Sequence, residues 1–232
     1  MRVIQPAGQR GSLKWIQQAV QRCPDLLQPP KLPPIRWLSP RRDDDFAEYR
    51  DSAFLERLGL PHLSEALKGF WPKRGPQWDA LGLTERGPVL VEAKAHVPEI
   101  FSPGTKASWV SRRMIEAAFR AVQEDLGVRP STNWAEVYFQ YANRLAFLWW
   151  LRKHGVEADL LFVSFLNDDD IGGPSSAEAW HAAFAGADYA LGLPARHRLA
   201  ANVHHVTPDV RQILDAGPGS GIEPDGYDGS GP

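Results

Sequence analysis

One short segment of the chain has polar side chains spaced for joint chemistry. Glu92 and Lys94 interrupt the otherwise apolar run from Val89 to Ala95. Because the side chains of a strand alternate between its two faces, Glu92 and Lys94 share one face, about 6–7 Å apart along the strand. The opposite face is wholly apolar and is expected to belong to the core. We therefore expect a carboxylate and an ammonium group inside a hydrophobic strand.

A second carboxylate precedes this segment in a strand of its own. Asp79 stands before residues 84–87, Thr-Glu-Arg-Gly, which have the residue types of a hairpin turn. In such a hairpin Asp79 can lie beside Glu92. Two carboxylates brought together away from water repel one another and raise each other's pKa unless a cation lies between them. A divalent metal ion would relieve this repulsion.

The pattern of Asp79, twelve further residues and then Glu92-Ala93-Lys94 between hydrophobic strand residues resembles the PD-(D/E)XK nuclease superfamily, which has the restriction-endonuclease-like fold. The resemblance implies that Asp79, Glu92 and Lys94 are catalytic. Asp79, Glu92 and the backbone carbonyl of Ala93 would hold one Mg²⁺ or Mn²⁺. Lys94 would orient the attacking water and stabilise the charge of the transition state. Trp78, rather than proline, precedes Asp79, so the subfamily stays unassigned.

In that superfamily a glutamate on the first core helix often completes the set of metal ligands. Two glutamates are available for this role. Glu56 lies towards one edge of the apolar face of a helix expected over residues 43–59. Glu65 points away from the apolar stripe of the following helix. We therefore prefer Glu56 as the third acid and keep Glu65 as the alternative.

Four further residues are candidates for binding the substrate. Gln140 and Arg144 are four residues apart, on one face of an expected helix. As in some nucleases of the superfamily, Gln140, Tyr141 and Arg144 could contact phosphates; the alternative is a buried hydrogen-bonded pair that fixes helix packing. His96 shares the face of Glu92 and is either a phosphate contact or a supporting group.

A group of basic residues follows the Lys94 strand. Lys106, Arg112 and Arg113 lie near the start of the next long helix and could follow a phosphate backbone. The alternative is a solvated helix face on which Glu116 and Glu124 pair with these cations.

The elements that must position these residues alternate between helices and strands. The pattern predicts a mixed α/β sheet of about five strands flanked by helices, and the resemblance implies a core of helix, three-stranded meander, helix and fourth strand. The expected helices cover residues 12–22, 43–59, 61–70, 106–126, 133–153 and 176–191, and the expected strands residues 78–84, 88–96, 160–166 and 202–207.

Proline and glycine divide the chain into three parts. Residues 1–42 are expected to form an N-terminal helix and a proline-rich arm, in which 24–40 is an extended connector. Residues 43–215 would form the nuclease-like α/β domain. Residues 216–232 hold six Gly and three Pro and are expected to be a flexible tail.

The composition narrows the classes of function. The 232 residues are 43% hydrophobic and 23% charged with a formal charge of −2, which suits a globular domain able to bury a core without disulfides. Cys23 is the only cysteine, so an intrachain disulfide and a zinc site made of thiolates are both excluded. No apolar run approaches the ~20 residues of a membrane helix. Near-neutral charge excludes a polybasic mode of nucleic-acid binding but allows a local basic face.

We therefore expect a Mg²⁺- or Mn²⁺-dependent nuclease that hydrolyses phosphodiester bonds of DNA. Residues 1–5 lack the apolar region of a secretory signal, so the expected location is the cytoplasm, away from membranes. The alternative is a catalytically silent nuclease-fold protein that acts as a binding or structural module. The presence of Asp79, Glu92 and Lys94 together favours activity, because a decayed site would usually have lost one of them.

Overall fold

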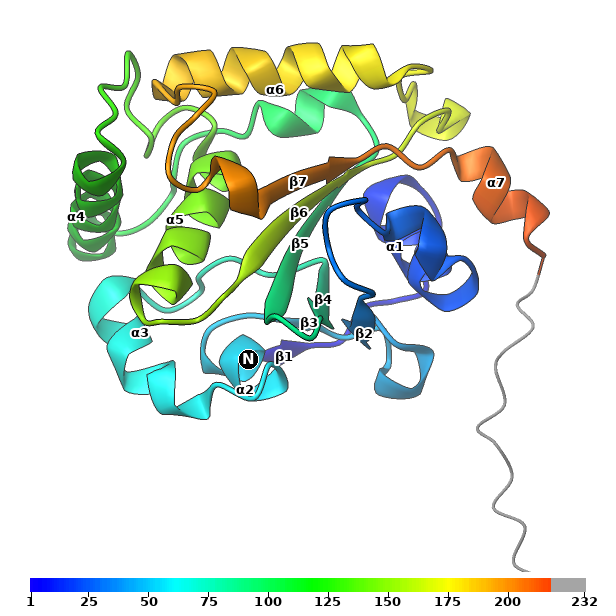
Figure 1. Ribbon diagram of the computed structural model, residues 1–232, viewed down its shortest axis with the longest axis horizontal. Coiled ribbons are helices and arrows are strands. Elements are labelled where there is room, and N and C mark those ends of the chain that lie inside the picture. Colours follow the sequence, from blue (N-terminus) through cyan, green and yellow to red (C-terminus); the bar gives the residue numbers. More distant parts are fainter. Residues whose placement is uncertain (218–232) are drawn as a thin grey trace, which may run out of the picture.

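A computed structural model describes residues 1–217 of the chain, and the tail predicted for 216–232 lies outside the described residues from 218 onwards. The molecule is a mixed α/β fold built on one five-stranded sheet (Figure 1). The strands, in spatial order, are β2 (Arg36–Ser39), β4 (Ala80–Leu83), β5 (Pro88–Lys94), β6 (Asp159–Ser164) and β7 (Val203–Val206). β2, β4 and β5 run antiparallel, whereas β5, β6 and β7 run parallel. The predicted mixed sheet of about five strands is confirmed.

Helices cover both faces of this sheet (Figure 1). α4, α5 and α6 lie on one side, and α1 and α7 lie on the other. The described helices are α1 (Gly11–Arg22), α2 (Ser52–Arg57), α3 (Ser64–Phe70), α4 (Trp109–Leu126), α5 (Phe139–Lys153), α6 (Ala177–Leu191) and α7 (Val210–Asp215). Short 3-10 turns cover Pro24–Leu27, Arg42–Asp44, Pro61–Leu63, Val97–Ile100, Asp169–Ile171 and Ala200–Asn202.

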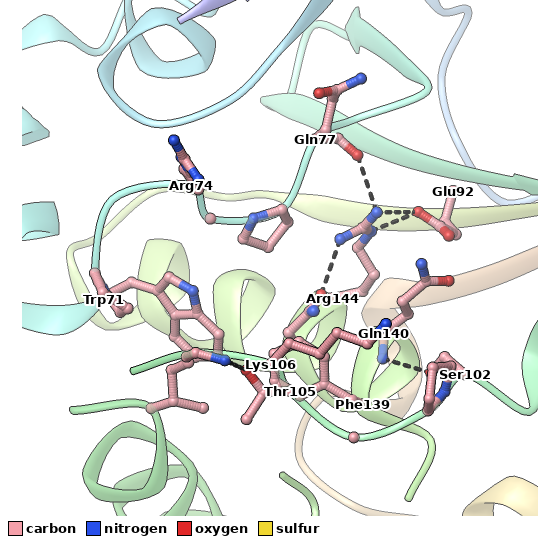
Figure 2. Close-up of a pocket in the computed structure, with 18 of the residues that line it drawn as sticks. Trp71, Arg74, Gln77, Glu92, Ser102, Thr105, Lys106, Phe139, Gln140 and Arg144 are labelled. Carbon is pink, nitrogen blue, oxygen red and sulfur yellow. Dashed lines mark hydrogen bonds and ion pairs between the residues drawn. The ribbon is translucent and has the colours of Figure 1, made fainter. Parts of the chain in front are cut away.

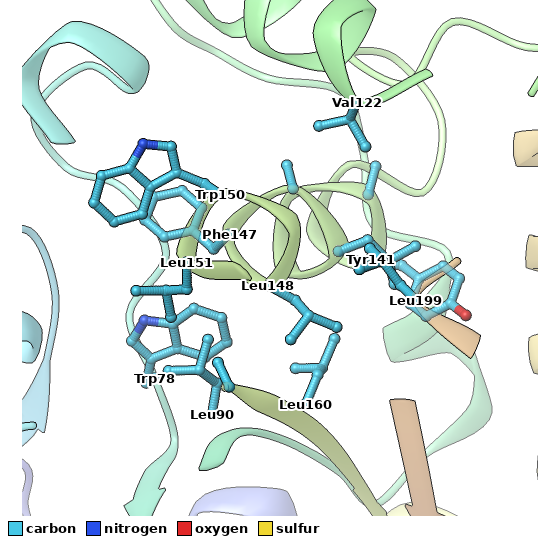
Figure 3. Close-up of a cluster of buried hydrophobic side chains, with 14 of the residues drawn as sticks. Trp78, Leu90, Val122, Tyr141, Phe147, Leu148, Trp150, Leu151, Leu160 and Leu199 are labelled. Atoms are coloured by element: carbon cyan, nitrogen blue, oxygen red, sulfur yellow. The ribbon is translucent and has the colours of Figure 1, made fainter. Parts of the chain in front are cut away.

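The core consists of two apolar clusters separated by the sheet. Leu90 of β5 and Phe162 of β6 face the cluster beneath α4, α5 and α6. Val91 and Val163 face the cluster beneath α1 and α7. The alternation predicted for β5 is therefore confirmed, and it holds this strand firmly between two apolar layers. Figure 3 shows the first cluster, in which the labelled side chains are Trp78, Leu90, Val122, Tyr141, Phe147, Leu148, Trp150, Leu151, Leu160 and Leu199.

The N-terminal 42 residues form part of this body rather than an arm. β1 (Arg2–Val3) pairs antiparallel with β3 (Glu48–Tyr49) in a separate two-stranded ribbon. α1, which confirms the helix predicted over 12–22, packs against β5. The segment expected to be an extended connector contains β2, whose hydrogen bonds to β4 complete the meander. The four-residue strand was missed because the prolines on both sides obscure its pattern.

The helix predicted over 43–59 is also corrected. Residues 42–44 form a 3-10 turn, β3 follows, and α2 begins only at Ser52. Asp45 and Phe46 have φ angles of 51° and 49°, which a right-handed helix does not allow. Asp51 also has a positive φ, of 54°. The chain therefore turns twice here and presents Glu48 from a strand.

Two long helices begin later than predicted, and both changes shape the site. α4 starts at Trp109, where the Ser108 side chain caps the helix by accepting a hydrogen bond from the backbone N–H of Ser111 (3.4 Å). α5 starts at Phe139, because Tyr138 has a φ of 53°. Residues 106–108 and 133–138, which were expected to be helical, lie in loops instead.

Candidate functional site

A cavity of about 740 Å³ opens at the ends of two inner strands of the sheet, where β5 ends and β4 begins. Its floor comes from the end of β5 and the residue before β4. Its walls come from the loops over 71–77 and 102–108 and from the first turns of α4 and α5. Figure 2 shows how side chains from these segments converge on Arg144 and Glu92.

The hairpin brings the predicted acids together at the floor. Ala80 of β4 pairs with Val91 of β5, so the next step of the register sets Asp79 opposite Glu92. Asp79 Oδ2 accepts a hydrogen bond from the backbone N–H of Ala93 (2.7 Å). All four residues of the predicted motif, Asp79, Glu92, Ala93 and Lys94, line this cavity. The arrangement depends on a local turn, which is why the sequence could predict it.

Glu92 is held between two buried cations. The Lys94 ammonium donates to Glu92 Oε1 (2.5 Å), and the Arg144 Nε–H donates to Glu92 Oε2 (2.5 Å). Glu92 is 3% exposed and Arg144 5% exposed, so water screens these contacts little. Burial alone would raise the pKa of Glu92, but Arg144 and Lys94 outweigh it and the pKa is lowered. The carboxylate of Glu92 is therefore ionised and fully paired.

Arg144 is anchored by more than Glu92. It donates to Asn143 Oδ1 (2.8 Å) and to the backbone carbonyl of Gln77 (2.9 Å), and Figure 2 marks the bond to Gln77 with a dashed line. Its guanidinium lies 4.8 Å from the centre of the Trp78 ring, within the range of a cation–π contact. The planar donor set of Arg144 thus ties α5 to the segment before β4.

A third carboxylate reaches the floor from an element that sequence analysis did not predict. Glu48 of β3 is 6% exposed and lines the cavity. The side-chain amides of Gln5 and Gln77 both donate to its Oε2. Burial, with a contribution from the charge of Glu92, raises the pKa of Glu48 despite these bonds. No sequence pattern marks Glu48, because its placement depends on the pairing of β3 with β1.

The floor therefore carries an excess of negative charge. Three carboxylates, those of Glu48, Asp79 and Glu92, face two cations, those of Lys94 and Arg144. The excess falls on Asp79, whose pKa is raised well above its ordinary value by burial and then by Glu92 and Glu48. Lys94 experiences the opposite field: burial lowers its pKa, but Glu92 and Asp79 outweigh burial and raise it. A perturbed carboxyl beside a charged lysine in a cavity is typical of a functional site.

The floor offers the kinds of ligand atom that a divalent metal prefers, but its acidic side chains are not close enough together to hold one. Carboxylate and carbonyl oxygens are the ligands that Mg²⁺ and Mn²⁺ prefer, and the excess charge favours a cation. Within residues 1–217, however, no group of three or more His, Cys, Asp or Glu side chains is close enough together to hold an ion. Both oxygens of Glu92 are hydrogen-bonded to Lys94 and Arg144. A metal would therefore require Glu92 to exchange one of these partners.

The weaker substrate-binding candidates divide into two groups. Gln140 and Arg144 both line the cavity. They do not form the hydrogen-bonded pair considered from the sequence: Gln140 Oε1 accepts a hydrogen bond from Lys94 (3.1 Å), and Arg144 donates to Glu92. Tyr141 lies outside this cavity, because its hydroxyl donates to Asp188 of α6 (2.7 Å) and its ring packs on Phe162. His96 follows the end of β5 and is not among the lining residues.

Neither glutamate expected as the third acid reaches the floor. Glu56 is exposed on α2. Glu65 is exposed on α3 and pairs with Lys68 of the same helix (2.5 Å). Neither lines the cavity, whose third acid is Glu48 instead. The expectation failed because it placed a helix over 43–59, where the chain forms β3 and only then the short α2.

The rim of the cavity is basic, in contrast to its floor. Lys73, Arg74 and Lys106 line it and are all exposed. In the part of the chain that the structure describes, no carboxylate lies within ion-pair distance of these three cations, and Figure 2 shows Arg74 and Lys106 on two different loops of the cavity wall. An anionic ligand could bind these cations while it approaches the acids and Lys94 below.

Comparison of the chain with protein-family models, with curated proteins and with solved structures found no match in any of the three. The function must therefore be argued from the cavity itself. Within the described residues, no helix combines the length and apolar character needed to cross a membrane.

Proposed function

We propose that this protein is a metal-dependent nuclease that hydrolyses phosphodiester bonds of DNA with a site of the PD-(D/E)XK type. The observation that carries the proposal is the surplus carboxylate in the cavity: Glu48, Asp79 and Glu92 lie around one lysine, beneath a basic rim. The order of elements supports it. The meander β2-β4-β5, the helices α4 and α5 and the parallel strand β6 follow the order that the resemblance implies, with β3, α2 and α3 inserted between β2 and β4. The helix before the meander is α1, not the helix expected over residues 43–59.

Each residue has a role that its position allows. A bound Mg²⁺ or Mn²⁺ would supply a water of lowered pKa and would offset charge on the phosphate. Asp79, Glu92 and the Ala93 carbonyl would hold it, with Glu48 as the additional acid. Lys94, fixed by Glu92 and by Gln140, would stabilise the charge that develops on the phosphate oxygens. The rim cations would hold the neighbouring phosphates of the strand.

One observation favours a second candidate function. Lys94 and Arg144 together hydrogen-bond both carboxylate oxygens of Glu92, as expected of an ion-pair network that has become structural. In that case the protein would be a catalytically silent member of the same fold that binds nucleic acid or another partner through the basic rim.

A cleavage assay separates the two candidates. We expect the parent protein to cut labelled DNA in the presence of Mn²⁺, and Asp79→Asn and Glu92→Gln to lose this activity. The control is Glu65→Gln, which removes the same charge from an exposed carboxylate and should leave cleavage unchanged. Absence of both cleavage and Mn²⁺ binding in the parent would leave only the silent module.

The identity of the third acid has a matched test of its own. Glu48→Gln should weaken the binding of Mn²⁺ in calorimetric titration, because it removes a floor carboxylate. Glu56→Gln should bind Mn²⁺ as the parent does, because Glu56 is exposed on α2 and lies outside the cavity. Equal affinities for the two variants would exclude Glu48 from the metal site.

A further inference from the structure

The first residue of α4 is an exposed tryptophan. Trp109 is 69% exposed and Val110, beside it, is 68% exposed. The chain has nine tryptophans, all within the described residues, and the other eight are buried or half-buried. Leaving a large apolar side chain in water forgoes roughly 1.5–3 kcal/mol of burial free energy. An isolated exposed apolar residue needs no explanation, but this one lies in a specific setting.

Trp109 begins a stripe that is otherwise basic. Arg113 and Arg120 follow it at four and eleven residues, which places all three on one face of the helix, and all are exposed. The Arg113 guanidinium lies 4.9 Å from the centre of the Trp109 ring. Lys106 precedes the helix on the cavity rim. We refer to Lys106, Trp109, Arg113 and Arg120 as the α4 stripe.

The cations of the α4 stripe are available for an external anion. Among residues 1–217, none of Lys106, Arg113 and Arg120 has a carboxylate within ion-pair distance, whereas Arg112 is bound by Glu116 (2.8 Å) and also by Glu136. The solvated face with glutamate partners expected from the sequence therefore holds for Arg112 alone.

The α4 stripe leads away from the candidate active site. Ser108 and Ser111, which precede and follow Trp109 in the sequence, line the cavity together with Lys106, whereas the other three residues of the stripe lie outside it. At 1.5 Å per residue, the stripe from Trp109 to Arg120 extends about 16 Å along the helix. α4 lies at the periphery of the molecule, beyond α5 (Figure 1), so this face is open to a long ligand.

We infer that the α4 stripe binds the single-stranded part of a nucleic acid whose adjoining phosphate enters the cavity. Exposed aromatic rings stack on bases, and an arginine over the ring adds a cation–π contribution. A duplex keeps its bases stacked inside, so Trp109 can reach only an unpaired base. Lys106, Arg113 and Arg120 would contact the phosphates on either side of that base. The inference rests on the proposed function and specifies its substrate as a strand with unpaired bases.

The test measures binding without cleavage. A fluorophore-labelled oligothymidylate and a blunt-ended duplex of equal length are titrated with the full chain in EDTA, and anisotropy reports the affinity. Trp109→Ala should weaken binding of the single strand about tenfold, within the range for the loss of one stacked base. Tyr189→Ala is the matched control, because Tyr189 is also an exposed aromatic residue, 83% exposed on α6 outside the cavity. It should bind both probes as the parent does.

The basic residues have a separate readout. Replacing Arg113 and Arg120 together by alanine should lower the salt dependence of single-strand binding, with the logarithmic slope reduced by about 0.7 for each lost phosphate contact. Trp109→Ala should leave that slope unchanged. Since these side chains are exposed, we expect the variants to fold, and thermal melts verify that they do.

The outcomes distinguish this inference from the proposed function. Equal single-strand affinities for Trp109→Ala and Tyr189→Ala would overturn the inference, as would an equal loss for single strand and duplex. A change of oligomeric state in Trp109→Ala, with unchanged single-strand binding, would assign Trp109 to a contact between copies of the chain. Trp109-dependent binding in a parent that never cleaves would support the inference and refute the nuclease.

Discussion

Asp79 bears the uncompensated charge of the cavity floor, so its neutralisation tests the electrostatic reasoning directly. Asp79→Asn removes one of three carboxylates that face two cations and leaves the floor balanced. The asparagine Oδ1 can still accept the hydrogen bond that the Ala93 N–H donates to Asp79 (2.7 Å). The substitution therefore removes a half-buried charge from the cavity floor without removing this hydrogen bond, and we expect the metal-free protein to become more stable.

The sign of the effect follows from the raised pKa of Asp79. Because burial, Glu92 and Glu48 raise this pKa, the neutral carboxyl is favoured in the folded state. Its ionisation destabilises the fold progressively as the pH rises from the ordinary value of 3.8 to the raised folded value. We expect Asp79→Asn to add about 1–2 kcal/mol above that window, within the range of single stabilising substitutions. For a chain of this size that is a rise in Tm of about 2–8 °C.

The assay is a thermal melt with and without Mn²⁺ at several pH values. At a hundredfold excess over its Kd, Mn²⁺ should stabilise the parent by about 2.7 kcal/mol and should not stabilise Asp79→Asn. The matched control is Glu85→Gln, which removes one negative charge from an exposed turn residue and should change neither melt. A lower Tm for metal-free Asp79→Asn, or an equal Mn²⁺ shift in the parent and the variant, would refute the reasoning.

Three further predictions concern the same elements. Lys94→Met should lower the free energy of unfolding by about 1.5–3 kcal/mol in urea, because the buried Glu92 loses a charged partner. An unchanged urea midpoint would exclude a stabilising ion pair between Lys94 and Glu92. The affinity for Mn²⁺ measured by calorimetry should rise as the pH increases above 4.5, the ordinary pKa of glutamate. Burial raises the pKa of Glu48, so its proton competes with the metal over this range. An affinity that does not depend on pH would contradict this. Gly87→Ala should destabilise the fold by about 1–3 kcal/mol in the same urea assay, because the new alanine Cβ would lie 2.2 Å from the backbone oxygen of Glu157. An unchanged free energy of unfolding would show that the turn can move at no cost.

Elements defined by local periodicity could be predicted from the sequence. β5 alternates between two apolar clusters as its residues require, and α1 follows the spacing of Leu13, Ile16 and Val20. The helix starts at Trp109 and Phe139 could not be predicted, because they depend on the loops that close the cavity. β2 was likewise hidden, since its partner β4 lies about 40 residues later in the chain.

The site divides in the same way. Asp79, Glu92, Ala93 and Lys94 could be assigned from the sequence because a tight hairpin sets their register, and a register is a local property. Glu48 and the pairing of Arg144 with Glu92 depend on contacts between distant segments, and no spacing in the chain encodes them. The sequence alone thus determined which strand carries the acids and the lysine. Only the tertiary structure decided how many carboxylates share the floor and which cations balance them, because burial and charge pairing arise when separate elements pack together.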